Sequence, residues 1–112
     1  MGGAASLIVP GTPGHTVLTA PGFLPDSVVP IATACQRQFE WIAERLASNG
    51  TYLCPPAMLA PGIRTGAYRM DGDMLVVDED GDSKISMEDF AVALMDEAES
   101  RRHNGRRFTV AY

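Results

Sequence analysis

Cysteine, basic residues and long apolar runs are all scarce in this sequence. Its 112 residues include two cysteines, too few for a disulfide framework, so a reducing, cytoplasmic setting is expected. The sequence has nine Lys and Arg residues and fourteen Asp and Glu residues, which give a net charge of -5. We therefore expect no nucleic-acid partner. No apolar run approaches the roughly 20 residues that a membrane span needs, so no membrane partner is expected either. With 46% hydrophobic and 21% charged residues, the composition indicates one small globular domain.

The common catalytic motifs are missing as well. The sequence holds no G-x-G-x-x-G turn and no P-loop, and no Ser, His and Asp stand at a spacing that suggests a triad. His15 and His103 are isolated, with no cysteine or carboxylate at ligand spacing. Cys35 falls on the apolar face of an expected helix, and nothing beside Cys54 predicts an activated thiol. No catalytic residue is therefore assigned.

Glycine and proline are concentrated near the N-terminus, where they make up eight of the first 22 residues. The first six residues fit the N-myristoylation pattern. Removal of Met1 exposes Gly2 at the N-terminus, and Ser6 occupies the Ser/Thr position of the pattern. No basic cluster follows, and a single acyl chain anchors a protein only weakly. The sequence favours a Gly-rich loop that leads into a short strand over residues 6–9, with a second short strand over 16–19.

Two segments have the periodicity of amphipathic helices, from about residue 30 to 47 and from about 87 to 98. The expected apolar face of the first helix consists of Ile31, Cys35, Phe39, Ile42 and Leu46. That of the second helix consists of Met87, Phe90, Ala91, Leu94, Met95 and Ala98. Asn49 and Gly50 are suited to end the first helix. Ser86, with Asp89 three residues on, is suited to cap the second.

The remaining apolar runs predict strands over residues 51–54, 67–70, 74–77 and 107–112. Asp71-Gly72-Asp73 would join the middle two strands as a hairpin, and residues 57–66 would form a loop. In the last strand Phe108, Val110 and Tyr112 alternate with Thr109 and Ala111. Helices that alternate with strands predict an α/β fold with two main helices and a partly parallel sheet.

The acidic segment from residue 78 to 89 resembles a calcium-binding loop. Asp78, Asp80 and Asp82 stand at the first, third and fifth positions of an EF-hand loop, where carboxylates converge on one cation. Ser83 occupies the usual glycine position, Asp89 replaces the usual glutamate, and the preceding segment is strand-like. The competing interpretation is a solvated acidic turn before a capped helix. No metal ligand is assigned, and a calcium-binding module remains an alternative function.

Five blocks of the sequence resemble, in order, one family of proteins. They cover residues 2–7, 54–57, 61–69, 85–94 and 107–112, and so span nearly the whole chain. The family is the atypical short-chain dehydrogenase group of NAD(P)H-binding proteins, known as NADH-flavin reductase-like or NAD-dependent epimerase-like. Gln36-Arg37-Gln38-Phe39 stands where ordinary short-chain dehydrogenases carry Tyr-x-x-x-Lys, which agrees with the atypical group.

The resemblance implies that residues 1–112 form a single domain equivalent to the C-terminal half of a Rossmann-like fold. In the intact family the chemistry is hydride transfer from NAD(P)H to a flavin or quinone-like acceptor. The resemblance places near the cofactor Gly2, Gly3 and Ala4, beside the nicotinamide ribose, and Pro55, Pro56 and Ala57, over the nicotinamide. The Gly-rich turn that holds the pyrophosphate is not among these residues, so this chain alone should bind NAD(P)H weakly or not at all.

The resemblance also predicts how the chain associates. A half-domain leaves a sheet edge unpaired, and unpaired edges favour association. The expected partner is a complementary half-domain or a second copy of the chain. A non-enzymatic domain that uses the same edge for interaction remains a further alternative.

Overall fold

The computed structural model describes residues 1–11, 14–20, 22–44, 50–103 and 105–112. The elements, in chain order, are η1 Asp26–Val28, α1 Val29–Ala43, β1 Thr51–Cys54, β2 Met58–Ala60, β3 Arg69–Asp71, β4 Lys84–Ser86, α2 Met87–Ser100 and β5 Arg106–Ala111. Within this part of the chain, no helix combines the length and the apolar character that crossing a bilayer requires.

Strand β5 is the centre of a three-stranded sheet with the order β1-β5-β3. β1 pairs with β5 in parallel, with Thr51 opposite Arg106, whereas β3 pairs with β5 antiparallel, with Asp71 opposite Thr109. β2 and β4 form a separate parallel pair. The predicted α/β fold with a partly parallel sheet is confirmed.

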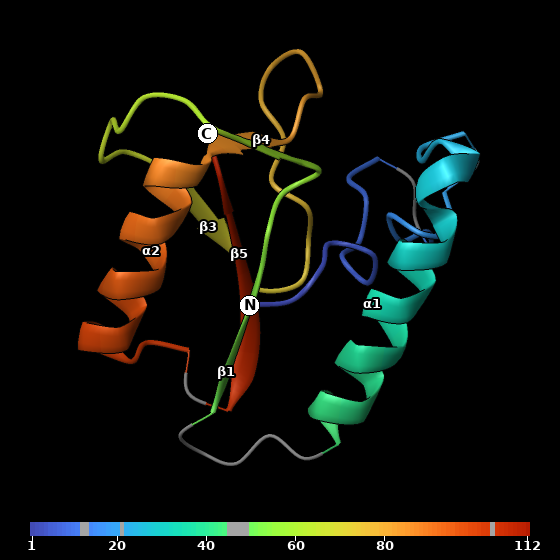
Figure 1. Cartoon of the computed structure of the whole chain (residues 1–112), viewed down its shortest axis with the longest axis horizontal. Coiled ribbons are helices and arrows are strands. Elements are labelled where there is room, and N and C mark those ends of the chain that lie inside the picture. Colours follow the sequence, from blue (N-terminus) through green and yellow to red (C-terminus); the bar gives the residue numbers. More distant parts are fainter. Residues whose placement is uncertain (12–13, 21, 45–49, 104) are drawn as a thin grey trace.

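The two helices lie on opposite sides of the β1–β5 pair (Figure 1). Successive side chains of β1 point to opposite faces. Tyr52 and Cys54 pack in a core with the N-terminal segment and with Phe39 and Ile42 of α1. Leu53 packs in a second core with residues of β4, α2 and β5, which are Ile85, Phe90, Ala93, Phe108 and Val110. The β1–β5 pair therefore has a separate apolar core on each face.

Both predicted helices are present, but their buried faces differ from the prediction. In α1, Ile31 is 67% exposed, while Cys35, Phe39 and Ile42 are half-buried as expected. The predicted residues Leu46 and Asn49 lie outside the described residues. In α2, the cap is confirmed, because the Ser86 side chain accepts a hydrogen bond from the Asp89 backbone N–H at 3.0 Å.

The apolar face predicted for α2 is wrong in most of its members. The helix buries Phe90 as predicted, together with Ala93 and the acids Asp89 and Glu97. The predicted members Met87, Leu94 and Met95 remain 47%, 44% and 60% exposed. Both acids accept hydrogen bonds within the chain, so their polarity does not keep them at the surface.

The short strands near the N-terminus and the predicted hairpin are not found. Residues 6–9 and 16–19 form no strand; Ile8 instead makes isolated bridges to Thr16 and to Met74. Asp71 Oδ1 accepts hydrogen bonds from the Asp73 and Met74 backbone N–H groups at 3.0 and 2.9 Å. This local turn directs residue 74 to the N-terminal segment, so β3 pairs with β5 and not with residues 74–77.

The strands β2 and β4 were not predicted. Met58–Ala60 falls in the segment expected to be a loop, and Lys84–Ser86 lies between the acidic turn and α2. Each strand has three residues, too few for an alternation of polar and apolar side chains to be recognised.

Candidate functional site

An apolar cavity of about 310 Å³ lies between the N-terminal segment, α1 and the residues that follow β1. Its walls include Ala4 from the N-terminal segment, Ala32 and Cys35 from α1, and the segment from Pro55 to Ala57. None of the described lining residues is charged. Ligand pockets typically span about 300–1,000 Å³, so the cavity is suited to one ring-sized apolar group.

The Pro55–Ala57 wall of the cavity is held at the end of β1. Pro55 lacks a backbone N–H, so the strand cannot continue past Cys54 with full pairing. Thr109 Oγ1 donates to the Cys54 carbonyl at 2.9 Å, which fixes the strand end on β5. The Ala57 N–H donates to Ser83 Oγ at 3.3 Å, which ties the wall to the acidic turn.

Gly2 and Gly3 occupy positions at which a larger residue does not fit. The Gly2 backbone N–H donates to the Leu53 carbonyl at 2.8 Å, and a Cβ at Gly2 would lie 1.7 Å from Tyr52 Oη. A Cβ at Gly3 would lie 2.6 Å from Cys35 Sγ. The two glycines therefore allow the N-terminal segment to approach β1 and α1 closely.

The structure brings together four of the six residues that the resemblance placed near a cofactor. Ala4, Pro55, Pro56 and Ala57 line one cavity, and Gly3 lies against Cys35, which lines the same cavity. A role in cofactor binding stays a prediction for all six. Sequence reasoning missed the wall contributed by α1, because the spacing of Ala32 and Cys35 indicates only an apolar helix face.

Two titratable groups near the cavity, Cys54 and Tyr52, have raised pKa values. Burial raises the pKa of the Cys54 thiol to about 11, and the nearby charge of Arg107 offsets this only in part. Burial also raises the pKa of Tyr52, whose hydroxyl lies 3.0 Å from Gln38 Oε1 and donates to it. Neither of these two groups is suited to act as a base or nucleophile.

Arg107 supports the site from β5. Its Nη1 donates to Ser6 Oγ at 2.6 Å and to the Ser6 carbonyl at 3.2 Å, and its Nε lies 3.1 Å from Asp73 Oδ1. Its guanidinium carbon lies 4.4 Å from the centre of the Phe39 ring, so it also contacts α1. The sequence does not reveal this role of Arg107, because charge alone does not show which arginine is enclosed by other segments.

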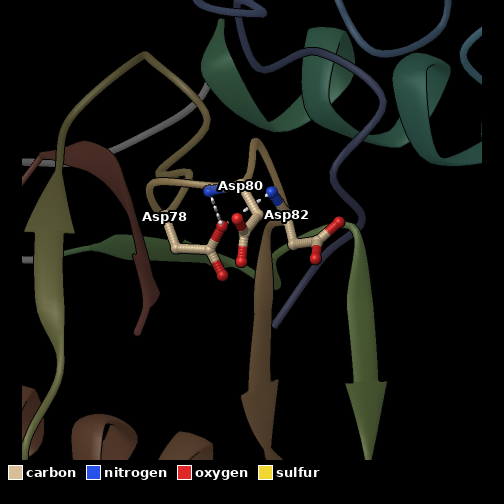
Figure 2. Close-up of side chains that lie close together, drawn as sticks. All are labelled: Asp78, Asp80 and Asp82. Carbon is tan, nitrogen blue, oxygen red and sulfur yellow. Dashed lines mark hydrogen bonds between the residues drawn. The ribbon is translucent and has the colours of Figure 1, made fainter.

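The three acids of the calcium-loop alternative do lie close together (Figure 2). One carboxylate oxygen from each of Asp78, Asp80 and Asp82 falls within 4.8 Å of the others. Asp78 Oδ1, however, accepts hydrogen bonds from the Asp82 and Asp80 backbone N–H groups, each at 2.9 Å, and these bonds lower its pKa. Residues 75–77 before the loop are irregular and β4 follows it, so the loop is not part of a helix–loop–helix unit.

We expect calcium titration to give no saturable heat below ~1 mM, because the Asp78 oxygen is already used by the turn. Isothermal calorimetry on the wild-type chain makes the measurement. Asp82→Asn is the matched variant, because Asp78 accepts from the backbone of residue 82 and not from its side chain. A saturable heat that Asp82→Asn removes would contradict this expectation and restore the calcium alternative.

Comparison with known proteins gives relatives for nearly the whole chain. No family model matches the sequence. Protein YwnB of Bacillus subtilis, described as uncharacterised, is 35% identical over 111 residues, which are 98% of this chain and 52% of YwnB. Several solved structures also align over 99% of this chain. A protein from Bacteroides thetaiotaomicron provisionally described as an epimerase has 35% identity and a TM-score of 0.89, with 50% of its length covered. One from Streptococcus pneumoniae provisionally described as an NADH-flavin reductase has 29% identity and a TM-score of 0.88, with 53% covered.

The chain thus spans about half the length of each of these relatives. Its helices and its mixed sheet superpose on half of a Rossmann-like structure in the two solved cases.

Proposed function

Because the chain is homologous to one half of Rossmann-like proteins of the NADH-flavin reductase and epimerase type, we propose that it is the nicotinamide-side half of an NAD(P)H-binding domain. The apolar cavity receives the nicotinamide ring. In a complete domain, the cofactor supplies the hydride, and a flavin or quinone-like molecule accepts it.

One observation carries this proposal: Ala4 and the segment from Pro55 to Ala57, which are far apart in sequence, line one cavity. A flat, uncharged ring is suited to walls made of alanine and proline side chains, which exclude water. Arg107 instead contacts Ser6, Asp73 and Phe39, and it is not among the residues that line the cavity. Without a cationic group in its walls, the cavity is suited to the ring and not to the diphosphate.

The proposal predicts that the chain binds the nicotinamide ring weakly and that the rest of the cofactor adds no affinity. Reduced nicotinamide mononucleotide, followed by amide chemical shifts, is expected to bind at millimolar concentration and to shift the signals of Ala4 and Ala57. NADPH is expected to bind no more tightly, because the 112 residues lack the Gly-rich turn that holds a diphosphate.

A pair of substitutions on α1 locates the binding site. Ala32→Phe adds a ring within the cavity wall and is expected to abolish the shifts. Ala34→Phe places the same ring at an exposed position of the same helix and should leave them unchanged. Micromolar NADPH affinity for the chain alone would refute the weak binding, and shifts that map elsewhere than the cavity would refute the site.

A further inference from the structure

We propose that the outer edge of β1 and the adjoining face of α2 form a docking surface for a second polypeptide. This polypeptide supplies a strand parallel to β1 and an apolar helix that packs beside α2. The inference rests on the proposed function in one respect: it takes the partner to resemble the half of the relatives that this chain does not match.

The first observation is the unpaired edge of β1. β1 has β5 on one side and is the end strand of its sheet among the described residues. In a parallel pair, alternate residues direct their backbone groups to alternate sides. The Gly50 carbonyl accepts from the Gly105 N–H on the β5 side, so Thr51 and Leu53 direct their backbone groups outward. Gly2 uses one of these groups, the Leu53 carbonyl, at 2.8 Å.

The second observation is the direction in which the N-terminal segment passes this edge. From its contact with Leu53, the segment continues to Ala4, which lies with Pro55 at the cavity beyond the end of β1. The segment therefore passes β1 in the same direction as β1 itself. A strand that extends this contact along the edge is parallel to β1. A second copy related by two-fold symmetry would instead place the two β1 strands antiparallel, so we infer a different chain.

The third observation is a hollow beside the same edge, with an apolar side and a charged end. A pocket of about 280 Å³ lies between β1 and α2; Leu53, Leu94 and Ala98 give it apolar walls, and Glu97 and Arg101 also line it. Leu94 is 44% exposed, and Met87, which is 47% exposed, lies two helical turns before it on the same flank of α2. A strand edge that uses one outward carbonyl for Gly2 and an exposed apolar helix flank thus adjoin, as strand addition with helix packing requires.

The test uses the part of YwnB that does not align with this chain, co-expressed with the chain as a separate polypeptide. We expect a one-to-one complex by size-exclusion chromatography with light scattering. Leu94→Asp is expected to weaken the complex at least tenfold. Met95→Asp makes the same change at a more exposed position of α2 that does not line the pocket, and it should change the affinity less than threefold.

Amide hydrogen exchange tests the edge directly. In the free chain, the Thr51 and Leu53 amides should exchange much faster than those of Tyr52 and Cys54, and in the complex they should become protected. Absence of a complex, a homodimer in place of the complex, or equal effects of the two aspartate variants would each overturn the proposal. A complex that forms but does not bind NADPH would refute the proposed function and leave the docking surface intact.

Discussion

Replacing Asp89 with asparagine lowers the melting temperature by on the order of 10 °C, the largest single-residue effect that we expect. Asp89 is fully buried at the start of α2. Its Oδ1 accepts hydrogen bonds from the Thr65 and Gly66 backbone N–H groups at 2.9 and 2.8 Å. Its Oδ2 accepts from Thr65 Oγ1 at 2.7 Å and from the Tyr112 hydroxyl. One carboxylate thus holds the loop before β3 and the chain end after β5 against α2.

Asparagine has nearly the same shape but only one oxygen. Its amide nitrogen would face the Thr65 and Tyr112 hydroxyls, both of which donate to the carboxylate in the wild-type chain. The substitution also removes the negative charge that strengthens all four hydrogen bonds. A buried donor that loses its acceptor is destabilising, and here the loss falls on several donors at once.

The same substitution changes the dependence of stability on pH. Burial alone would raise the pKa of Asp89, but the hydrogen bonds from Tyr112 and Thr65 outweigh it and hold the pKa below its ordinary value. The ionised form therefore stabilises the fold above the unfolded-state pKa of about 3.9, and this contribution is lost as the pH falls towards the folded-state value. The asparagine variant lacks this contribution. Below about pH 4 its stability should fall less steeply than that of the wild type.

Urea unfolding between pH 2 and 7 measures both effects. The unfolding free energy of the variant still depends on pH in the acid range, because hydrogen bonds to Glu97 and Asp78 also lower the pKa of each of these carboxyls. Glu88→Gln is the matched control, since Glu88 neighbours Asp89 but its side chain, within the described part of the chain, accepts only from the exposed Gly62 N–H, at 2.8 Å. An Asp89→Asn variant as stable as the control, or with an unchanged acid slope, would contradict the prediction.

Replacing Arg107 with methionine is expected to lower the free energy of unfolding by about 2 kcal/mol. The ion pair with Asp73 contributes little to this value, because the Asp73 side chain is 74% exposed. The larger contribution comes from Ser6, which is buried and loses the donor to its carbonyl and hydroxyl. The substitution also removes the contact between the guanidinium and the Phe39 ring, which links β5 to α1.

Arg106→Met is the control for this prediction, because Arg106 is exposed and, among the described residues, its side chain donates only to the nearby Arg102 carbonyl, at 3.0 Å. Denaturant unfolding with both variants gives the difference in stability. Amide exchange should further show that Arg107→Met lowers protection in α1 more than in α2. Equal losses for the two arginines would mean that Arg107 does not join the segments as the structure indicates.

Features that depend on neighbouring residues could be predicted from the sequence. The two helices, the Ser86 cap and the strands at Thr51–Cys54 and Arg106–Ala111 follow from local spacing and capping chemistry. The errors concern contacts between distant residues. Residues 74–77 have the composition of a strand, but in the described part of the chain Met74 alone among them forms a β-bridge, to Ile8, which is 66 residues away in the chain. The burial of Asp89 likewise depends on Thr65 and Tyr112, which no helical periodicity reveals.

For the same reason, the candidate site could be predicted only in part from the sequence. The resemblance pointed to Ala4 and to Pro55–Ala57, and the structure places them around one cavity. The α1 wall depends on how the helix packs: its apolar pattern included Ile31 and Cys35, which line the cavity, but nothing in that pattern showed that they face Pro55–Ala57. The spacing of the acids at residues 78–82 did indicate that their side chains converge, but not that the turn itself uses Asp78.

The unequal anchoring of the two helices has a consequence for ligand access. No residue of α1 is buried, whereas α2 buries four, so local unfolding of α1 requires less free energy than unfolding of α2 with the sheet. α1 is also the wall of the cavity that contains Ala32 and Cys35. Transient detachment of this helix would admit a molecule larger than the cavity mouth while β1, β5 and α2 stay folded. For such a molecule, the rate at which α1 detaches sets an upper limit on the rate of binding.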